Sequence, residues 1–427
     1  MLMSKKKELI PKLRFPEFVD EGEWEEKILG KLAKKIVKKN KDGLINNVFT
    51  NSAIDGIVDQ RDFFDKDIAN KNNLENYYIV EDGDYVYNPR ISNIAPVGPI
   101  SKNKTKKRGV LSPLYTVFRF TNKNNDFYEY YFKTIHWYSA IRKASNTGAR
   151  FDRMSITDSV FMNIPILYPL PSEQQKIASC LSSLDEMIAA QVQKLDLLKD
   201  HKKGLMQNLF PQEGEKVPKF RFKEFENNGE WIERKLGEIA HISKLAGYEF
   251  TKHIVYENKG KIIALRGLNI KNNGLELSDV KYIDNSELNK LNRSKLFIDD
   301  LMFTYIGTIG EVALIPENDK YYLAPNVSRI RPNKKEIYAK FLLQYFNVPN
   351  FKGKEISKYI SSSSQPALTM ENVRKFSILL PNLNEQQKIA SCLSSLDTLI
   401  TAHTEKIEQL KLHKKGLIQG LFPKMND

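Results

Sequence analysis

Two cysteines in 427 residues are too few for a disulfide framework or a cysteine zinc site. Cys180 and Cys392 have no C-x-x-C pattern around them, so we expect small buried side chains in a reducing compartment. No apolar run approaches the eighteen residues of a membrane span, and the first residues, MLMSKKKELIPKL, lack the apolar core of a signal peptide. The sequence therefore predicts a cytoplasmic protein with no membrane partner.

Motifs for nucleotide and metal chemistry are also missing. The chain has no G-x-x-x-x-G-K-[ST] loop and no G-x-G-x-x-G after a strand, and no histidine has a second metal ligand at a suitable spacing. The stretch Tyr87-Asn88-Pro89-Arg90 only partly matches the Asn-Pro-Pro-aromatic signature of adenine methyltransferases, because Arg90 replaces the second proline. We predict no catalytic residue, cofactor site or metal site in this chain, which favours a recognition component of a larger assembly.

The composition is that of a globular, basic protein. Apolar residues make up 41% of the chain and aromatic residues 11%, enough to fill the cores of two or more domains. The formal net charge is +14, and clustered Lys and Arg gain affinity for a polyanion by releasing its counterions. Charge alone leaves DNA, RNA, anionic lipid and a merely solubilising surface open.

An internal duplication organises the chain. The thirteen residues EQQKIASCLSSLD begin at Glu173 and again at Glu385, and the match continues at an offset of 212 for 27 identities in 39 positions. Upstream, residues 11–32 match 218–239 at 12 of 22 positions. The order is a short repeated block, a variable segment and a long repeated block, twice over.

The two variable segments, or inserts, lie at about 30–165 and 237–380 and share almost no identity. A fold duplicated for one function would have no reason to keep the repeated blocks, which we call the frame, while the inserts between them diverge. The pattern therefore predicts a scaffold that presents two different readers. Short β-prone runs between Asn, Gly and Pro indicate that both inserts are mixed α/β.

The long repeated block has the spacing of a coiled-coil helix of about 38 residues, roughly 57 Å long at 1.5 Å per residue. Apolar residues alternate in steps of four and three. They are Ile177, Leu181, Leu184, Ile188, Leu195, Leu198, Leu205 and Leu209 in the first copy, and Ile389, Leu393, Leu396, Ile400, Ile407, Leu410, Leu417 and Leu421 in the second. Because a narrow apolar stripe needs a partner, we expect the copies to pair, with an antiparallel arrangement favoured by the pseudo-two-fold duplication.

Polar residues interrupt this seam. Gln191 and His403 are expected to set its register, and for His403 this role is favoured over a metal ligand. Ser172 and Asn384 are predicted N-caps. The HKKG stretch near each helix end is expected to be a solvated basic terminus, with a contact to phosphate or to a partner subunit as the alternative.

Basic and polar side chains cluster in the loops of both inserts. Arg, Asn, Gln and Ser read base edges, whereas Lys mainly contacts phosphate. For any single residue a solvated surface position is the simpler explanation, and it is the clustering that favours recognition. The candidates are Lys106, Lys107, Arg108, Arg150 and Arg153 in the first insert and Arg266, Asn269, Ser363 and Gln365 in the second. The glycines of GTIGE (Gly307 and Gly310) are explained by a tight turn rather than a phosphate loop.

Several stretches together resemble the specificity subunit of type I restriction-modification systems. They are the EQQKIA helix after a strand that ends in proline (Pro169, Pro381), the GL-x-Q-x-LFP ends, and RGLNI and GTIGEVALIP in the second insert. The resemblance covers essentially the whole chain. It implies that FTYIGTIGEVALIP, with Tyr305 and Thr308, faces DNA, and that YNPRISNIAPVGPI, with Arg90, stands in its place in the first insert.

The resemblance implies an α/β (α+β) fold with two target recognition domains, each reading one half of a split site, separated by an antiparallel pair of helices. The corresponding boundaries are 1–170 and 213–382 for the domains and 171–212 and 383–427 for the helices. The subunit itself would be non-catalytic.

The implied partners are double-stranded DNA, two modification subunits that use S-adenosylmethionine to methylate adenine, and motor-nuclease subunits that use ATP and Mg. A nuclease or methyltransferase acting alone is the first alternative, and it would need the motifs that are missing. A coiled-coil adaptor with no DNA role is the second, and it would need neither divergent inserts nor the basic charge.

Overall fold

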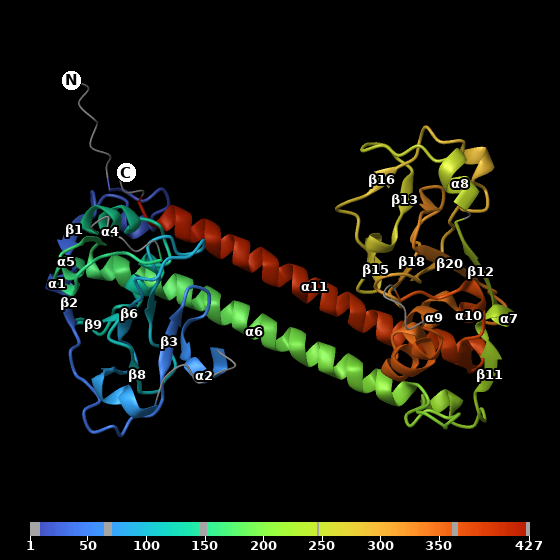
Figure 1. Cartoon of the computed structure of the whole chain (residues 1–427), viewed down its shortest axis with the longest axis horizontal. Coiled ribbons are helices and arrows are strands. Elements are labelled where there is room, and N and C mark those ends of the chain that lie inside the picture. Colours follow the sequence, from blue (N-terminus) through green and yellow to red (C-terminus); the bar gives the residue numbers. More distant parts are fainter. Residues whose placement is uncertain (1–8, 64–70, 146–151, 246, 361–365, 424–427) are drawn as a thin grey trace. The chain divides into compact units, whose positions relative to one another are not determined.

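The chain forms two compact mixed α/β units. The computed structural model describes residues 9–63, 71–145, 152–245, 247–360 and 366–423. The first unit consists of residues 1–191 and 406–427, and the second of residues 192–405 (Figure 1). The two long helices, α6 (Pro171–Leu209) and α11 (Leu383–Leu421), each contribute to both units.

The first unit is built on an antiparallel sheet with strand order β2-β9-β6-β7, beside which β3 pairs with β4 and β5 with β8. Its elements before α6 are β1 (Glu25–Ile28), α1 (Leu29–Leu32), β2 (Ala33–Lys35), β3 (Phe49–Ser52), β4 (Gly56–Asp59), α2 (Gln60–Phe63), β5 (Tyr78–Val80), β6 (Tyr85–Tyr87), β7 (Ile100–Lys102), β8 (Gly109–Leu111), β9 (Thr116–Phe120), α3 (Asp126–Tyr131), α4 (Tyr138–Ala144), α5 (Asp158–Met162) and β10 (Pro165–Tyr168).

The central strand β6 shows why the sheet forms. Its sequence Tyr-Val-Tyr is rich in β-prone residues, and successive side chains enter different cores. Tyr85 and Tyr87 join an aromatic core with α3, α4 and α5, where Tyr87 stacks on Phe161 with ring centroids 4.5 Å apart. Val86 points to a separate cluster with Phe49. The strand is therefore buried on both faces.

The second unit repeats this plan with strand order β12-β20-β17-β18 and adds a three-stranded sheet, β16-β13-β19. Its elements before α11 are β11 (Ile232–Lys235), α7 (Leu236–Ile239), β12 (Ala240–Lys244), α8 (Gly247–Lys252), β13 (Ile263–Leu265), β14 (Ile270–Lys271), β15 (Gly274–Leu275), β16 (Lys281–Tyr282), β17 (Leu301–Thr304), β18 (Val312–Leu314), β19 (Tyr321–Leu323), β20 (Val327–Pro332), α9 (Ala339–Phe346), α10 (Met370–Arg374) and β21 (Ser377–Leu380). Leu301 and Phe303 of β17 pack with the helices and Met302 with the added sheet, as in β6.

Each insert is closed at its base by an antiparallel pair of strands, of which the first lies in the short repeated block and the second lies shortly before the long repeated block. β1 pairs with β10 so that Ile28 faces Pro165, and β11 pairs with β21 so that Lys235 faces Ser377. The start and the end of an insert are thereby held next to each other. This arrangement explains how one frame can carry two sequences that differ almost throughout.

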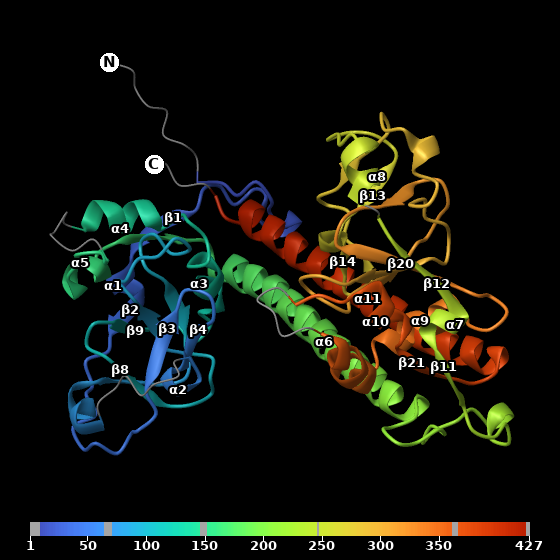
Figure 2. The same cartoon turned by 45° about the vertical axis from the view of Figure 1, so that its right-hand side comes forward.

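The predicted helices and their heptad seam are confirmed. The apolar seam positions are buried or half-buried in both helices, as are Gln191 and His403. In the first unit the start of α6 packs beside the end of α11, with Ile177, Leu181 and Leu421 in one core (Figure 2). Within each unit the paired helix segments are antiparallel, as predicted.

Buried ion pairs attach the short repeated blocks to the helix starts. Arg14 binds Glu173 through Nε and Nη2 at 2.8 and 2.9 Å, and Arg221 binds Glu385 in the same way at 2.8 and 2.7 Å. All four side chains are at most 7% exposed. The glutamine that follows each glutamate also has a structural role. Gln174 Nε2 donates to the carbonyl oxygen of Pro169, and Gln386 Nε2 donates to that of Pro381.

The predicted N-caps are wrong by about one half-turn. Ser172 and Asn384 both lie inside the first turn of their helices, because α6 already begins at Pro171 and α11 at Leu383. In α11 the cap is Asn382, whose Oδ1 accepts a hydrogen bond from Glu385 N at 3.0 Å. Proline suits the first turn of α6 since it has no N–H to leave unpaired.

The first lysine of each HKKG stretch pairs with an aspartate of the other long helix. In the second unit Lys202 Nζ donates to Asp397 at 2.5 Å, and in the first unit Lys414 pairs with Asp185. These lysine side chains are only 11% and 15% exposed, so the expectation of a solvated basic end is wrong for them. The aspartate that ends EQQKIASCLSSLD in each long helix pairs with the HKKG lysine of the other long helix. This pairing explains why both stretches are repeated.

Candidate nucleic-acid interface

The loops that leave the central strands occupy equivalent places in the two units. They connect β6 to β7 and β17 to β18, and each meets the segment that precedes a short helix with a threonine N-cap. Pro89 O accepts a hydrogen bond from Met154 N, and Tyr305 O accepts one from Leu368 N, both at 2.9 Å. Segments that are far apart in each insert therefore converge at one end of each sheet.

Arg90 and Arg153 lie side by side in the first unit. They face each other across an isolated antiparallel bridge. Arg90 is exposed, whereas Arg153 is half-buried and pairs with Asp152 at 2.9 Å. The hydrogen bond from Arg153 lowers the pKa of Asp152 below its ordinary value. Two guanidinium groups against one carboxylate leave positive charge at this loop, which suits phosphate or the acceptor edge of guanine.

Lys106, Lys107 and Arg108 lie at the other end of the same strands. They belong to the connection from β7 to β8, whereas the β6–β7 loop joins the opposite end of β7. Arg108 pairs with Glu81 at 3.0 Å, and Lys106 N donates to Asp82 Oδ1 at 3.2 Å. The structure therefore does not bring these three residues together with the two arginines of the β6–β7 loop.

Arg266 and Asn269 stabilise a turn after β13. Asn269 is fully buried, and its Nδ2 donates to the carbonyl oxygens of Glu276 and Asp279 at 2.9 and 2.8 Å. Its Oδ1 accepts from Arg266 N at 3.1 Å, and Arg266 Nη2 donates to Asp279 Oδ1 at 3.2 Å. The Asn269 amide has no free donor to offer a base edge. Asn269 therefore has a structural role in this turn in place of the predicted contact with a base edge.

The GTIGE stretch forms the tight turn that its glycines predict. Gly307 and Gly310 have φ angles of +78° and +89°, which glycine adopts without strain. The Thr308 side chain is exposed at the tip of the turn. Tyr305 is 9% exposed at its base, where burial raises the pKa of its hydroxyl. Of these two predicted contacts, only Thr308 is open to a ligand in this conformation.

Three candidates, Arg150, Ser363 and Gln365, lie outside the described residues. Their described neighbours are placed at the converging loops. Ile306, directly before the GTIGE turn, forms an isolated bridge with Ala367, just as Arg90 does with Arg153 in the first unit.

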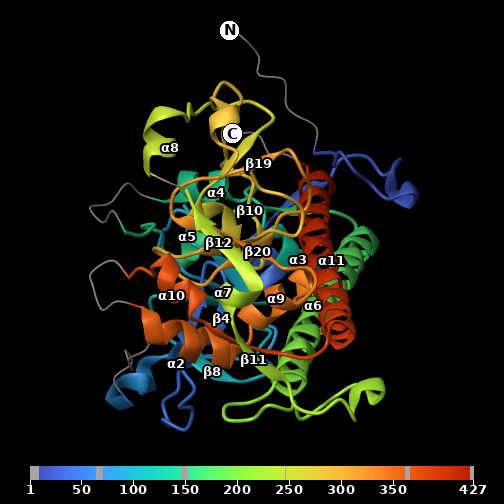
Figure 3. The same ribbon diagram turned by 90° about the vertical axis from the view of Figure 1, so that its right-hand side faces the viewer.

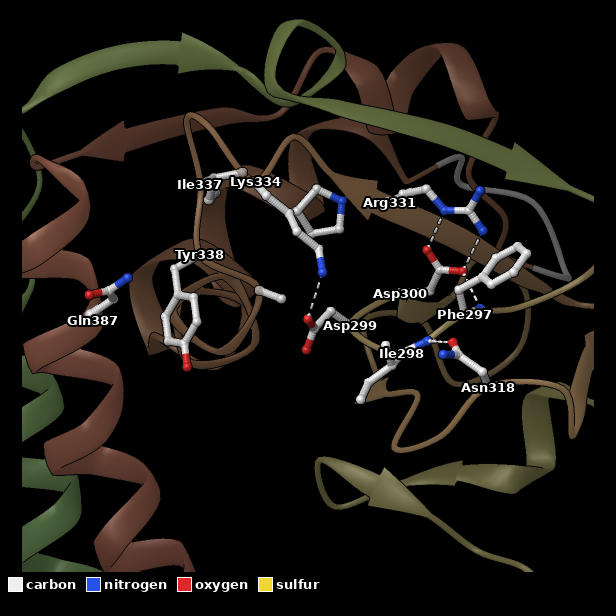
Figure 4. Close-up of a pocket in the computed structure, with 12 residues that line it drawn as sticks. Phe297, Ile298, Asp299, Asp300, Asn318, Arg331, Lys334, Ile337, Tyr338 and Gln387 are labelled. Carbon is white, nitrogen blue, oxygen red and sulfur yellow. Dashed lines mark hydrogen bonds and ion pairs between the residues drawn. The ribbon is translucent and has the colours of Figure 1, made fainter.

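An ion pair between a buried aspartate and a partly exposed arginine, which the sequence did not indicate, supports the sheet in each unit. Arg119 donates to Asp84 at 2.5 and 2.9 Å, and Arg331 donates to Asp300 at 2.6 and 2.7 Å. The arginines are 212 positions apart, like the helix blocks, but the aspartates are 216 apart, so a comparison at one fixed offset does not align both. Figure 4 shows the second pair, with the Arg331 guanidinium carbon 4.7 Å from the Phe297 ring centroid.

The pocket in Figure 4 lies beside this pair in the second unit, and its charged groups are already paired. Lys334 donates to Asp299 at 3.1 Å, and Asn318 Oδ1 accepts a hydrogen bond from Ile298 N at 2.8 Å. Its apolar wall includes Ile337 and Tyr338. The residues that line it do not form a nucleophile with an adjacent base.

Within the described ranges, no three His, Cys, Asp or Glu side chains are grouped so that they could hold a metal ion. Cys180 and Cys392 are both free thiols and half-buried, and burial raises the pKa of Cys392. None of the helices in the described part of the chain is long and apolar enough to cross a membrane.

Both repeats match one family model, whose description is type I restriction modification DNA specificity domain. The matches cover residues 21–200 and 228–412. The two matches correspond to the two repeated frames with their inserts, so the family pattern extends over most of the chain.

Individual relatives carry the same description. The MjaX specificity subunit of a type I restriction enzyme from Methanocaldococcus jannaschii is 31% identical over 161 residues, which are 36% of this chain and 37% of that protein. The MjaVIII specificity subunit from the same organism is 26% identical over 325 residues, or 74% of each chain. The solved type I restriction-modification S subunit from M. genitalium has a TM-score of 0.58 at 15% identity, covering 97% of this chain and 100% of that one, which supports the fold.

Proposed function

The chain belongs to the type I restriction modification DNA specificity family, and we propose that it reads a two-part, asymmetric DNA site with one unit for each half. The observation that carries this proposal is the contrast between frame and loops. Four features are repeated between the units. They are the strand pair at the base of each insert, the four-stranded sheet, the buried arginine–glutamate pair and the lysine–aspartate pair between the long helices. The converging loops differ, with Arg90 and Arg153 in one unit and Thr308 in the other.

We further propose that two modification subunits and the motor-nuclease subunits dock on this chain. Each unit has a helix pair made of the start of one long repeated helix and the end of the other. The chain can therefore offer the same surface to the same partner twice. S-adenosylmethionine, ATP and Mg are assigned to those partners. The chain itself would have a recognition role and no catalytic one.

Methylome sequencing of cells with and without this gene tests the proposal. We expect N6-methyladenine to disappear at one motif made of two specified halves with an unspecified gap. A methylome that is unchanged by the deletion would rule out the reading role and leave the adaptor alternative.

The helices set the gap between the halves in this proposal, so lengthening them should widen it. Inserting one heptad into both helices, between Gln191 and Val192 and between Glu405 and Lys406, adds about 10 Å at 1.5 Å per residue. That rise corresponds to roughly three base pairs of B-DNA. We expect the methylated motif to keep both halves and to gain about this many unspecified positions.

Insertion into one helix alone is the matched control for this experiment. It lengthens only one of the two antiparallel helices and shifts their register, so the Lys202–Asp397 and Lys414–Asp185 pairs cannot both form. We expect loss of folding or of methylation rather than a wider gap. A double insertion that leaves the gap unchanged would contradict the spacer role.

A further inference from the structure

Strand β12 forms one edge of the four-stranded sheet in the second unit (Figure 3), and cationic side chains gather on one face at this edge. His241 faces Arg331 across β12 and β20, and the next pair on the same face is Ser243 with Arg329. Directly opposed side chains in an antiparallel sheet have Cβ atoms about 5 Å apart. These four residues are therefore neighbours on one face of the sheet.

Two more arginines complete this surface. Arg374 of α10 donates Nη2 to the carbonyl oxygen of Ile242, on the edge strand, at 3.0 Å. Arg293 is exposed, and its carbonyl oxygen accepts a hydrogen bond from Arg329 Nη1 at 3.1 Å. We call His241, Arg293, Arg329, Arg331 and Arg374 the cation cluster.

The charges in the cation cluster are largely unbalanced. Asp300 neutralises Arg331, but no carboxylate among the described residues forms an ion pair with Arg293, Arg329 or Arg374. Arg329 is only 4% exposed, and burial followed by repulsion from Arg331 lowers its pKa. A buried guanidinium with no carboxylate partner is costly unless another anion approaches it.

Two buried polar atoms of the same cross-strand pair have no hydrogen-bond partner. They are Ser243 Oγ and Arg329 Nε, in side chains that are each 4% exposed. The Arg329 Nε can only donate, and a serine hydroxyl can donate as well. An acceptor is therefore what this pair lacks.

The first unit has no such feature at the equivalent place. There Lys34 faces Arg119, the counterpart of Arg331, and the next pair is Ile36 with Val117, joined by a 2.8 Å hydrogen bond from Ile36 N to Val117 O. Val117 is fully buried in an apolar cluster against which Ile36 packs. The same frame thus accepts an apolar pair, so the Ser243–Arg329 pair is not required by the fold.

We propose that the cation cluster binds a phosphate group of the DNA backbone, and that this phosphate site belongs to the second unit alone. The inference rests on the proposed function, because it takes DNA as the ligand. Guanidinium groups match the paired oxygens of a phosphate, and three of them here have no carboxylate partner. The exposed members, His241, Arg293 and Arg374, are placed to meet the ligand first.

His241 gives this site a dependence on pH. Burial and then the charges of Arg329, Arg331, Arg374 and Arg293 lower the pKa of its imidazole. A phosphate beside it favours the protonated form, so the pKa is higher in the DNA complex than in the free protein. DNA binding therefore takes up a proton. Affinity increases as the pH falls through the pKa of His241 in the complex, and it levels off below the pKa in the free protein, which lies under the ordinary histidine value of about 6.5.

Salt-dependent DNA binding by the full chain tests the site. His241→Ala and Arg293→Ala are compared with the wild type on a labelled duplex that carries the methylated motif. At a pH below the pKa of the free His241 side chain, where the imidazole is charged, we expect each to weaken binding several-fold and to reduce the slope of log K against log salt by about one, without changing which sequences are preferred. Lys219→Ala removes an exposed charge of the same unit outside the cluster and is expected to leave the slope unchanged.

The outcomes separate this inference from the proposed function. If the wild type shows no preference for its motif, the proposed function fails. If it does, and both cluster variants keep the affinity and slope of Lys219→Ala, the phosphate site is overturned while the reading role stands.

A second measurement identifies the anion. The imidazole signal of His241 in histidine-labelled protein, assigned by its loss in His241→Ala, is titrated alone, with inorganic phosphate and with the duplex. An upward shift of its pKa with the duplex is the expected result. A shift with inorganic phosphate but none with the duplex, or no shift with either, would overturn the proposal, since the cluster would then hold a free anion or only water.

Discussion

Replacing Arg14 with alanine is expected to lower the free energy of unfolding of the first unit by about 3–5 kcal/mol. The Arg14 and Glu173 side chains are 6% and 1% exposed, and two hydrogen bonds join them. Alanine leaves the Glu173 carboxylate buried without its counter-charge. It also removes the 2.6 Å hydrogen bond from Arg14 Nη1 to Gly22 O, which joins two parts of the N-terminal block.

The duplication supplies a matched test of this effect. Arg221→Ala should cost a similar amount in the second unit, where Glu385 loses its partner. Lys375→Ala, which breaks an exposed pair with Glu371, should change stability by no more than about 0.5 kcal/mol. Hydrogen exchange followed by mass spectrometry reads each unit separately during urea unfolding. Arg14→Ala and Lys375→Ala variants of equal stability would show that the buried pair is not what holds the junction.

The heptad spacing was sufficient to predict the helices, because a stripe of leucine and isoleucine in steps of four and three has one structural solution. It could not show that Lys202 meets Asp397. That contact depends on the antiparallel register, in which residues near the end of one helix face residues near the start of the other. Two adjacent lysines near a helix end indicate a solvated basic terminus when the facing residue is not known, so the sequence alone does not predict the burial of Lys202.

The candidate site was less predictable because side-chain chemistry does not reveal burial. Asn269 has the amide that suits a base edge, yet the turn after β13 uses its Nδ2 and Oδ1. Arg90 and Arg153 come together only through the fold of the loop. Arg329 and His241 lie on two strands whose sequences indicate ordinary β-structure, and only the cross-strand register places them on one face.

Replacing residues 30–165 with the chain's own residues 237–377 is expected to abolish methylation at the natural motif and to create a motif whose two halves are both the second half. The ends of the graft fit because Gly237 occupies the place of Gly30 in the short helix after the first strand, and Ser377 occupies the place of Pro165 at the start of the strand that closes the insert. Methylome sequencing of a strain that carries only the grafted chain measures the result. The reciprocal graft should duplicate the first half instead.

The contact between insert and helix decides whether the graft is seated correctly. In the natural first unit Tyr130 Oη donates to Asp185 at 2.9 Å, and in the second Gln344 Nε2 donates to Asp397 at 2.8 Å. Since Asp185 and Asp397 end identical helix blocks, Gln344 of the grafted copy can take the place of Tyr130. A grafted chain that folds and methylates but keeps the original first half would show that sequence is read by the repeated frame, and the division between frame and reader would be wrong.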